Sequence, residues 1–245
     1  MNPTDNLLLA ALGEEERAHL LTLMHPVQLA IGDLLYEQDA PVTDVFFFTS
    51  GAASLLILME DGHALEPGII GREGMLGFPI GLGQDRSRWR SIMQVPGEAL
   101  VMSRADLSRL LRQGGDLPAL LADYAGLLIS FIAQSAACAQ FHSLEQRTAR
   151  WLLLMQDRSR TDEFAITQEY LAFMLGANRP SETLVLNALS ARGTLELNRG
   201  RIRVLDREAL LRDTCECYAR VQIEYAHGVP ADELGDDAVA TPPDR

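Results

Sequence analysis

Arg179, Ser181 and Glu182 bring three kinds of DNA-reading chemistry to the start of one predicted helix. An arginine pairs with guanine edges, a hydroxyl binds a phosphate oxygen, and a carboxylate accepts a hydrogen bond from the cytosine amine. Arg199 and Arg201 follow in a predicted hairpin, from which they reach backbone phosphates. The types and the order of these side chains predict a site for double-stranded DNA.

A helix-turn-helix is the element that must position these side chains. The pattern predicts a helix over residues 167–175, a turn over residues 176–178 and a second helix over residues 179–190. Thr167 and Asn178 are suitable caps for the two helices. Such a second helix enters the major groove by its N-terminal end. The predicted DNA-contact residues are Thr167, Gln168, Asn178, Arg179, Pro180, Ser181, Glu182, Arg199 and Arg201.

The surroundings of this site are also predictable. Leu184, Leu186 and Leu189 are expected to pack the second helix against its domain. Two short strands, near residues 194–197 and 201–205, form a hairpin wing. The ordered set of helix, turn, helix and arginine-bearing wing favours a winged helix-turn-helix domain.

The charge distribution permits this assignment although the whole chain is acidic. The 245 residues carry a formal net charge of -13. Residues 141–212, however, contain eleven arginines and nine acidic residues, which leaves a net charge of +2. The acidity therefore lies outside the predicted DNA-binding segment.

The N-terminal half of the chain has the pattern of a β-rich domain. After a short helix over residues 14–24, β-prone runs alternate with Gly, Pro and Asp turn signals up to residue 104. Strands at this close spacing favour a jelly-roll or β-roll. The predicted strands cover residues 27–31, 34–36, 45–49, 52–59, 64–70, 91–94 and 99–102.

Helical periodicity returns after residue 104, with a short helix over residues 105–112 and a long one over residues 117–141. Apolar residues recur along the long helix at spacings of four and three, a heptad pattern that can be buried against a second copy. The alternative is a single helix packed on its own β domain. The predicted dimer seam consists of Leu120, Tyr124, Leu127, Phe131, Gln134, Cys138 and Phe141.

Together these elements predict an α+β fold in four parts. A β-roll sensor domain covers residues 1–116, and a dimerisation helix covers residues 117–141. A winged helix-turn-helix domain follows over residues 142–212, and a C-terminal extension over residues 213–245. The extension ends in an acidic tail with little to bury, which we expect to be disordered.

The spacing of cysteines and histidines matches no common zinc motif. The cysteines are Cys138, Cys215 and Cys217, and the Cys-x-Cys pair has no neighbouring histidine in the sequence. His142, near the end of the long helix, is interpreted as structural. We therefore expect reduced thiols, no metal and no cofactor. The opening residues fit neither a signal peptide nor a membrane span, so we expect a cytoplasmic protein with no membrane partner.

Over nearly its whole length the chain resembles the Crp/Fnr family of transcription regulators. The resemblance rests on the stretch LGANRPSETLVLNALSARG and on GREGMLG, residues 71–77, which is similar to the family's turn into its ligand cassette. It implies a cyclic-nucleotide-binding-type β-roll near residues 15–115 and base-reading roles for Arg179, Pro180 and Ser181. It also implies a homodimer on a two-fold symmetric operator, with RNA polymerase as a further candidate partner.

The sequence departs from the nucleotide-binding members of that family. Those members place a Gly-Glu pair on the ribose and an Arg-Ser pair on the cyclic phosphate. Here Phe78-Pro79 follows Gly77, so the ribose carboxylate is missing, and the phosphate pair is either Arg86-Ser87 or involves Arg88. We expect a sensor domain that is degenerate for cyclic nucleotide and whose small-molecule effector is unknown. The candidate pocket residues are Gly77, Phe78, Arg86, Ser87 and Arg88.

A sequence-specific DNA-binding transcription regulator acting as a homodimer is the predicted function. The alternatives are a regulator that responds to cyclic nucleotide, and a signalling or scaffold module whose winged helix binds protein. The sequence contains no nucleophile elbow, phosphate-binding loop or His-Glu-x-x-His motif, so we expect no enzymatic activity.

Overall fold

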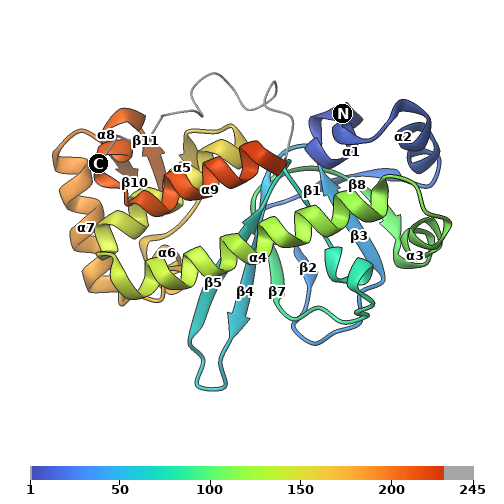
Figure 1. The fold of residues 1–245 in the computed structure, drawn as a ribbon. Helices are drawn as coiled ribbons and strands as arrows, with labels where there is room; N and C mark the ends of the chain where they lie inside the picture. Colours follow the sequence, from blue (N-terminus) through green and yellow to red (C-terminus); the bar gives the residue numbers. More distant parts are fainter. Residues whose placement is uncertain (1, 229–245) are drawn as a thin grey trace.

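A computed structural model describes residues 2–228 of the chain (Figure 1). A β-rich N-terminal domain and a helical C-terminal domain are joined by one long helix, α4, that extends along both (Figure 1). The helices are η1 (Pro3–Asp5), α1 (Leu7–Ala11), α2 (Glu14–Leu21), η2 (Phe78–Leu82), α3 (Arg104–Gln113), α4 (Leu117–Phe141), α5 (Leu144–Ser159), α6 (Gln168–Met174), α7 (Arg179–Ala191), α8 (Arg207–Asp213) and α9 (Glu216–Gly228). The predicted disordered tail, from residue 229 onward, lies outside the described residues.

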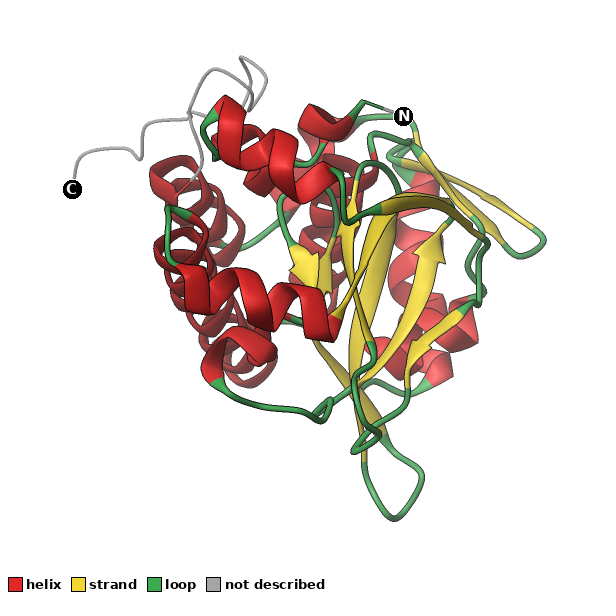
Figure 2. Ribbon diagram, turned by 90° about the vertical axis from the view of Figure 1, so that its right-hand side faces the viewer, coloured by secondary structure: helices red, strands yellow, loops and turns green. Residues whose placement is uncertain are grey.

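The strands form two four-stranded antiparallel sheets in the N-terminal domain and one small sheet in the C-terminal domain (Figure 2). They are β1 (His25–Leu29), β2 (Leu34–Tyr36), β3 (Asp44–Phe48), β4 (Ala52–Leu58), β5 (Ala64–Ile70), β6 (Met75–Leu76), β7 (Arg90–Val95), β8 (Gly97–Ser103), β9 (Glu163–Phe164), β10 (Leu195–Asn198) and β11 (Arg201–Val204). The first two sheets have the orders β1-β8-β3-β6 and β2-β7-β4-β5.

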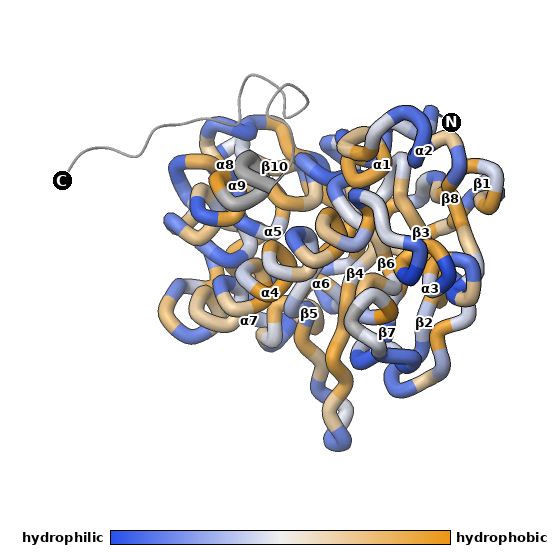
Figure 3. Tube along the Cα trace, turned by 45° about the vertical axis from the view of Figure 1, so that its right-hand side comes forward, coloured by the Kyte–Doolittle hydropathy of each residue, from blue (hydrophilic) through white to orange (hydrophobic). Residues whose placement is uncertain are grey.

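The two large sheets share one hydrophobic core, which confirms the predicted β-rich domain. Phe47 and Phe48 of β3 and Met93 of β7 are fully buried in it, together with Leu55 of β4 and Ile70 of β5. All seven predicted strands are present within about two residues of their expected bounds. Figure 3 shows that the β4–β5 hairpin is hydrophobic along its strands and hydrophilic at its tip.

Helix α4 has the predicted bounds, and its two ends are fixed by neighbouring residues. At the start, the carboxylate of Glu16 in α2 accepts hydrogen bonds from the backbone N–H groups of Asp116 (3.0 Å) and Leu117 (3.2 Å). At the end, His142 leaves the helical conformation, and Ser143 caps α5 in a capping box with Gln146. The junction between the long helix and the C-terminal domain is therefore only two residues long.

The C-terminal domain contains the predicted helix-turn-helix and wing. Strands β10 and β11 pair with Asn198 opposite Arg201, so the wing turns through two residues, and Gly200 adopts a φ of 71° there. Strand β9 adds a third strand to the wing sheet in the order β10-β11-β9. Helix α9, which the sequence analysis did not predict, returns along α4 (Figure 1).

Candidate nucleic-acid interface

The turn between α6 and α7 is built by a Schellman motif. The N–H of Ala177 bonds to the carbonyl of Ala172 at 2.8 Å, and the N–H of Gly176 bonds to the carbonyl of Phe173 at 3.2 Å. Gly176 has a φ of 61°, the left-handed conformation that this motif requires. The motif sets the angle at which α7 leaves the turn, which confirms the predicted helix, turn and helix.

Asn178 and Thr167 cap the two helices as predicted. The side chain of Asn178 accepts a hydrogen bond from the N–H of Ser181 at 2.9 Å, and that of Thr167 accepts one from the N–H of Tyr170 at 3.1 Å. Pro180 lies in the first turn of α7, where a missing N–H breaks no helical bond. These contacts leave the first turn of α7 at the protein surface.

Arg179, the first residue of α7, has a side chain that is 67% exposed. Its Nη1 lies 3.6 Å from Oε2 of Glu169 on α6, an exposed ion pair that water and salt screen strongly. Gln168 also faces α7, where its side-chain oxygen accepts a hydrogen bond from the hydroxyl of Thr183 at 2.9 Å. The Arg179 guanidinium can therefore leave the carboxylate of Glu169 and bind a base edge or a phosphate instead.

Glu182 is not available for DNA contact, so that prediction is wrong. Its side chain is fully buried and accepts hydrogen bonds from the Thr148 hydroxyl at 3.1 and 3.2 Å. Burial raises its pKa to about 7, although Thr148 and the charge of Arg147 act in the opposite direction. Glu182 therefore packs against α5, whereas the Arg179 side chain extends into solvent from the first residue of α7.

Leu184 was expected to pack inward, and this is also wrong, because 72% of its surface is exposed. Leu186 and Leu189 are fully buried as predicted. Leu184 and Asn187 lie on the outward side of α7, on the same side as Pro180. The sequence analysis missed Leu184 because it assigned every leucine in the helix to the core, and it did not consider Asn187.

The wing presents its arginines on one exposed side. Arg201 and Arg203 alternate with buried Ile202 and Val204 along β11, so both guanidinium groups leave the same face of the strand. Arg201 forms an ion pair with Glu163 of β9. Arg199 stands at the exposed tip of the turn. The predicted wing arginines thus lie in positions from which phosphate contacts can form.

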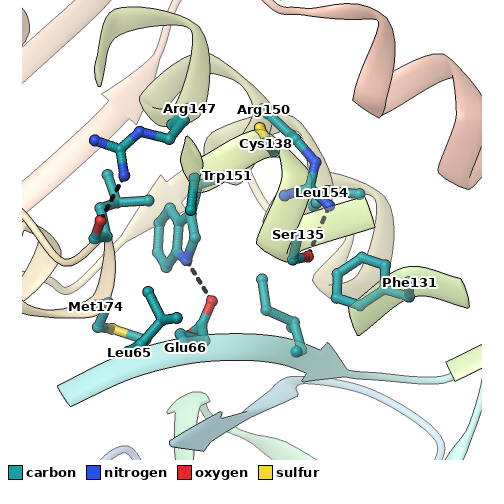
Figure 4. A pocket seen from close by; sticks show the side chains of 14 residues that line it. Leu65, Glu66, Phe131, Ser135, Cys138, Arg147, Arg150, Trp151, Leu154 and Met174 are labelled. Atoms are coloured by element: carbon teal, nitrogen blue, oxygen red, sulfur yellow. Dashed lines mark hydrogen bonds between the residues drawn. The ribbon is translucent and has the colours of Figure 1, made fainter. Parts of the chain in front are cut away.

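The C-terminal domain contacts the β domain through helices α5 and α6. The indole N–H of Trp151 on α5 donates to Glu66 of β5 at 2.7 Å (Figure 4), and Tyr170 on α6 accepts from Gln94 of β7 at 3.1 Å. Burial raises the pKa of Glu66 to about 8. Sequence patterns gave no sign of these contacts, because each joins residues that are at least 76 positions apart.

A cavity of about 40 Å³ lies beside Trp151, between α4, α5, α6 and β5 (Figure 4). Arg147 and Arg150 are among the residues that line the cavity. Arg147 donates a hydrogen bond to the carbonyl of Leu175, and Arg150 donates one to the hydroxyl of Ser135. Small-molecule pockets have volumes of roughly 300–1,000 Å³. This cavity is therefore a packing defect at the domain boundary rather than a site for a nucleotide.

The five candidate effector residues do not line one pocket. Phe78 is buried and stacks on Trp89, with ring centroids 5.8 Å apart. The hydroxyl of Ser87 donates to the backbone carbonyl of Trp89 at 2.6 Å.

The two arginines of that set lie at the surface, where both contact Asp39. The glycine of the set, Gly77, has no room for a side chain because Val45 and the Tyr36 hydroxyl lie against it. An arginine that binds a phosphate inside the roll has to be buried there, and neither Arg86 nor Arg88 is. The structure therefore does not support the predicted effector pocket.

The predicted dimer seam is wrong for Tyr124, Phe131 and Cys138, which are all buried within their own chain. Tyr124 packs against Gly74 and Phe78 of the β domain. Phe131 lies beneath the guanidinium groups of two α5 arginines. For these three residues the heptad pattern therefore reflects burial by the β domain, α5 and α9, and not by a second copy of α4. Packing within a single chain was the alternative interpretation in the sequence analysis. Among the other four, Leu120, Leu127 and Gln134 are half-buried and Phe141 is exposed.

A different face of α4 is exposed and almost uncharged. It carries Ile129, which is 61% exposed, and Gly126, around which a side chain would have open space. The exposed residues repeat at spacings of three and four: Ala119, Ala122, Gly126, Ile129, Ala133, Ala136 and Gln140. We call this set the α4 stripe.

Within the described residues α4 is also the one helix long and apolar enough to cross a membrane, with a mean hydropathy of 1.5 and 33% of its most apolar window buried.

The three cysteines, which lie far apart in the sequence, meet at the C-terminal end of α4. The Sγ atoms of Cys138 and Cys215 are 3.5 Å apart, and Sγ of Cys217 lies 3.4 Å from Nδ1 of His142. The expectation of a cysteine pair without a nearby histidine is therefore wrong in space, because His142 lies one helical turn beyond Cys138 and faces the same cluster.

Two family models match the chain. A model of the cyclic nucleotide-binding domain matches residues 26–114, and a model of the Crp-like helix-turn-helix domain matches residues 146–213. The two matches correspond to the β domain and to the domain that contains α6, α7 and the wing. Comparison with curated protein sequences gave no match.

Several solved structures have the same fold. FixK2 of Bradyrhizobium japonicum is 15% identical with a TM-score of 0.66, and the match covers 78% of this chain and 98% of that one. The c-di-GMP-responsive global regulator CLP of Xanthomonas campestris is 16% identical with a TM-score of 0.63, covering 79% and 100%. TTHB099, a CRP-family regulator of Thermus thermophilus, is 20% identical with a TM-score of 0.61, covering 76% and 95%.

Proposed function

The chain belongs to the Crp/Fnr family of DNA-binding transcription regulators, and on this basis we propose that it binds a two-fold symmetric operator as a homodimer. Members of this family regulate transcription and are not enzymes. The observation that carries the proposal is the exposed first turn of α7, where Arg179 stands beside the cap residue Asn178. We place this function in the cytoplasm, where a bacterial chromosome is accessible.

Base reading is assigned to the outward side of α7. Arg179 pairs with a guanine edge, and Leu184 packs against a thymine methyl group. Ser181, Arg199 and Arg201 contact the phosphate backbone and hold the helix in register. Glu182 has no part in this interface, because its role is to fix α7 on Thr148 of α5.

Dimerisation is assigned to the α4 stripe rather than to the seam first predicted. Its heptad spacing and small side chains suit close packing of two parallel helices. The high hydropathy of α4 and its low burial in one chain also favour a partner on this face. A two-fold axis along α4 places the two α7 helices on the same side of the dimer, as a two-fold symmetric operator requires.

We infer that the β domain is degenerate for cyclic nucleotide. The aromatic rings of Phe78, Trp89 and Tyr124 pack together in the region that follows the GREGMLG turn. A ligand in that space has to displace buried aromatic side chains, which is costly. The β domain then acts by its rigid contacts with α4, α5 and α6.

The test is binding of the purified protein to genomic DNA fragments, followed by footprinting of the enriched sites. We expect protection of a pseudo-palindrome and an affinity that falls steeply with salt. Arg179→Ala is expected to weaken operator binding by about 1–3 kcal/mol and to relax the base preference. Arg112→Ala, an exposed arginine on α3, is the matched control and leaves binding unchanged.

Two results would contradict the proposal. One is unchanged operator affinity and base preference in Arg179→Ala. The other is enrichment of no DNA sequence over a random pool, which favours the alternative that the winged helix binds protein. Addition of cyclic nucleotides to the same assay tests the inference that the β domain does not respond to them. A change in operator affinity would contradict this inference and leave the proposal of DNA binding intact.

A further inference from the structure

Four side chains with metal-binding atoms converge where α4 ends and α9 begins. Cys138 and His142 project from the last turns of α4, and Cys215 and Cys217 lie at the start of α9. Their three Sγ atoms and the histidine nitrogen all lie within 4.8 Å of one another. The cysteines are buried and His142 is half-buried, so the cluster is closed to bulk water on most sides.

The distances inside the cluster are close to those of a tetrahedral metal site. With Zn–S bonds of about 2.3 Å, two sulfur ligands of one zinc ion are roughly 3.8 Å apart. Here the Cys138 and Cys215 sulfurs are 3.5 Å apart, and the Cys217 sulfur is 3.4 Å from Nδ1 of His142. The set therefore has the size of an ion's first coordination sphere before any ion is bound.

The outer neighbours of the cluster are also those of a metal site. Nε2 of His142 lies 3.2 Å from Oε2 of Glu216, so the Nε2–H group donates a hydrogen bond to the carboxylate and the Nδ1 lone pair is directed at the sulfurs. The side-chain amide of Gln134 donates to the Cys217 sulfur at 2.9 Å. A carboxylate behind a histidine ligand and an N–H donor on a cysteine sulfur both stabilise bound metal.

The local charge balance also suits a bound dication. Three thiolates and a neutral imidazole around Zn²⁺ leave one negative charge in excess. The buried guanidinium of Arg150 interacts electrostatically with all three cysteines and supplies the compensating positive charge. An arginine with this placement offsets the cost of burying a charged site.

We propose that Cys138, His142, Cys215 and Cys217 form a four-coordinate Zn²⁺ site of the Cys3His type. The metal joins α9 to the last turn of α4, next to the two-residue junction His142-Ser143 that leads into the DNA-binding domain. Binding converts three thiols to zinc-bound thiolates and releases their protons to solvent. The proposal concerns metal binding and does not depend on the operator or the dimer proposed above.

The direct test uses the wild-type chain. Protein purified without chelators is expected to contain one zinc ion per chain by elemental analysis. Removal of zinc lowers the midpoint of thermal unfolding, and added Zn²⁺ restores it, whereas Mg²⁺ does not because it prefers oxygen ligands. Co²⁺ added to the zinc-free protein gives the thiolate charge-transfer band and the intense d–d bands of a tetrahedral site.

Variants then assign the ligands. Cys217→Ala and His142→Ala are expected to weaken Zn²⁺ binding at least about tenfold in competition with a chromophoric chelator. His63→Ala, an exposed histidine on the β4–β5 hairpin, is the matched control and keeps wild-type affinity. Glu216→Gln changes an exposed carboxylate, so the fold is preserved, and a loss of about 10- to 100-fold is expected from the lost orientation of His142.

Several outcomes would overturn the proposal. The first measurement uses the folded wild-type chain, so absence of zinc, together with no tetrahedral Co²⁺ spectrum, overturns it directly. A disulfide between Cys138 and Cys215 in freshly purified protein does the same, because it removes two ligands. Wild-type Zn²⁺ affinity in His142→Ala and Cys217→Ala shows that the ion binds elsewhere.

Discussion

Arg158 of α5 donates through Nε to Oε1 of Glu73 at 2.8 Å, and this ion pair is buried at the boundary between the two domains. The same Glu73 oxygen accepts the backbone N–H of Gly71 at 3.0 Å. Gly71 has no room for a side chain, because Cβ of Arg158 would lie 2.8 Å away. The GREG turn of the β domain is therefore a docking point for α5, and its glutamate holds the two domains together.

Arg158→Ala is expected to destabilise the chain by about 3–5 kcal/mol, because it leaves the Glu73 carboxylate buried without its partner. The measurement is the free energy of unfolding from a urea titration. Arg212→Ala removes an exposed ion pair with Asp206 and should change stability by less than about 1 kcal/mol. Equal effects of the two substitutions would contradict the role given to the buried pair.

Ile129→Glu is expected to convert the dimer to a monomer, since it places two like charges against each other in the α4 stripe. Sedimentation or light scattering gives the mass directly. Met59→Glu is the matched control, because Met59 is 59% exposed against 61% for Ile129 and lies on the β4–β5 hairpin instead. A variant that remains dimeric would show that the two chains pair through another surface.

Glu66→Gln is expected to flatten the dependence of stability on pH. Burial raises the pKa of Glu66 from 4.5 to about 8, so between these values the folded chain holds a proton that the unfolded chain has lost. The free energy of unfolding therefore falls as pH rises from about 5 to 8 and levels off above that. The glutamine keeps the neutral form at all pH values and removes this part of the slope.

The measurement is the thermal midpoint of both proteins at several pH values, followed by the tryptophan fluorescence of Trp89 and of Trp151, the donor to Glu66. Glu182 has a raised pKa of about 7 and gives a slope of the same sign in both proteins, so it cancels in the comparison. Parallel curves for wild type and variant would mean that Glu66 is already ionised at neutral pH.

Glu169→Gln is expected to raise affinity for any duplex by about two- to fivefold, because it frees Arg179 and removes a negative charge beside the phosphate path. The gain should be largest at low salt. Glu15→Gln, an exposed carboxylate on α2, is the control and should leave affinity unchanged. A decrease in affinity would instead indicate that Glu169 itself contacts DNA.

Local patterns in the sequence predicted the elements well where one segment sets its own structure. The bounds of α4 follow from its continuous helical period and from the glycines before it, and the Gly176 turn follows from the left-handed conformation that glycine adopts. Cap residues such as Asn178 act within three positions of themselves, so sequence spacing is enough to find them.

Contacts between distant segments were not predictable in the same way. A heptad pattern shows that Tyr124 and Phe131 are buried but not which element buries them, and here it is the β domain and α5 rather than a second copy. Glu182 has the residue type of a base contact, yet the packing of α7 on α5 buries it against Thr148, a contact between segments 34 residues apart. The cluster around Cys138 depends on α9, whose return along α4 left no spacing signal in the chain.

The carboxylate of Glu16 has a consequence for the smallest unit of this chain that folds by itself. It satisfies two backbone donors at the start of a helix that begins 101 residues later. A deletion of α1 and α2 removes the buried Leu8, Leu9 and Leu20, uncovers the core residues that pack against them, and leaves the first turn of α4 without its acceptor. Shortened versions that begin at β1 should therefore fray at the first turn of α4, so the autonomous folding unit includes the residues before the first strand.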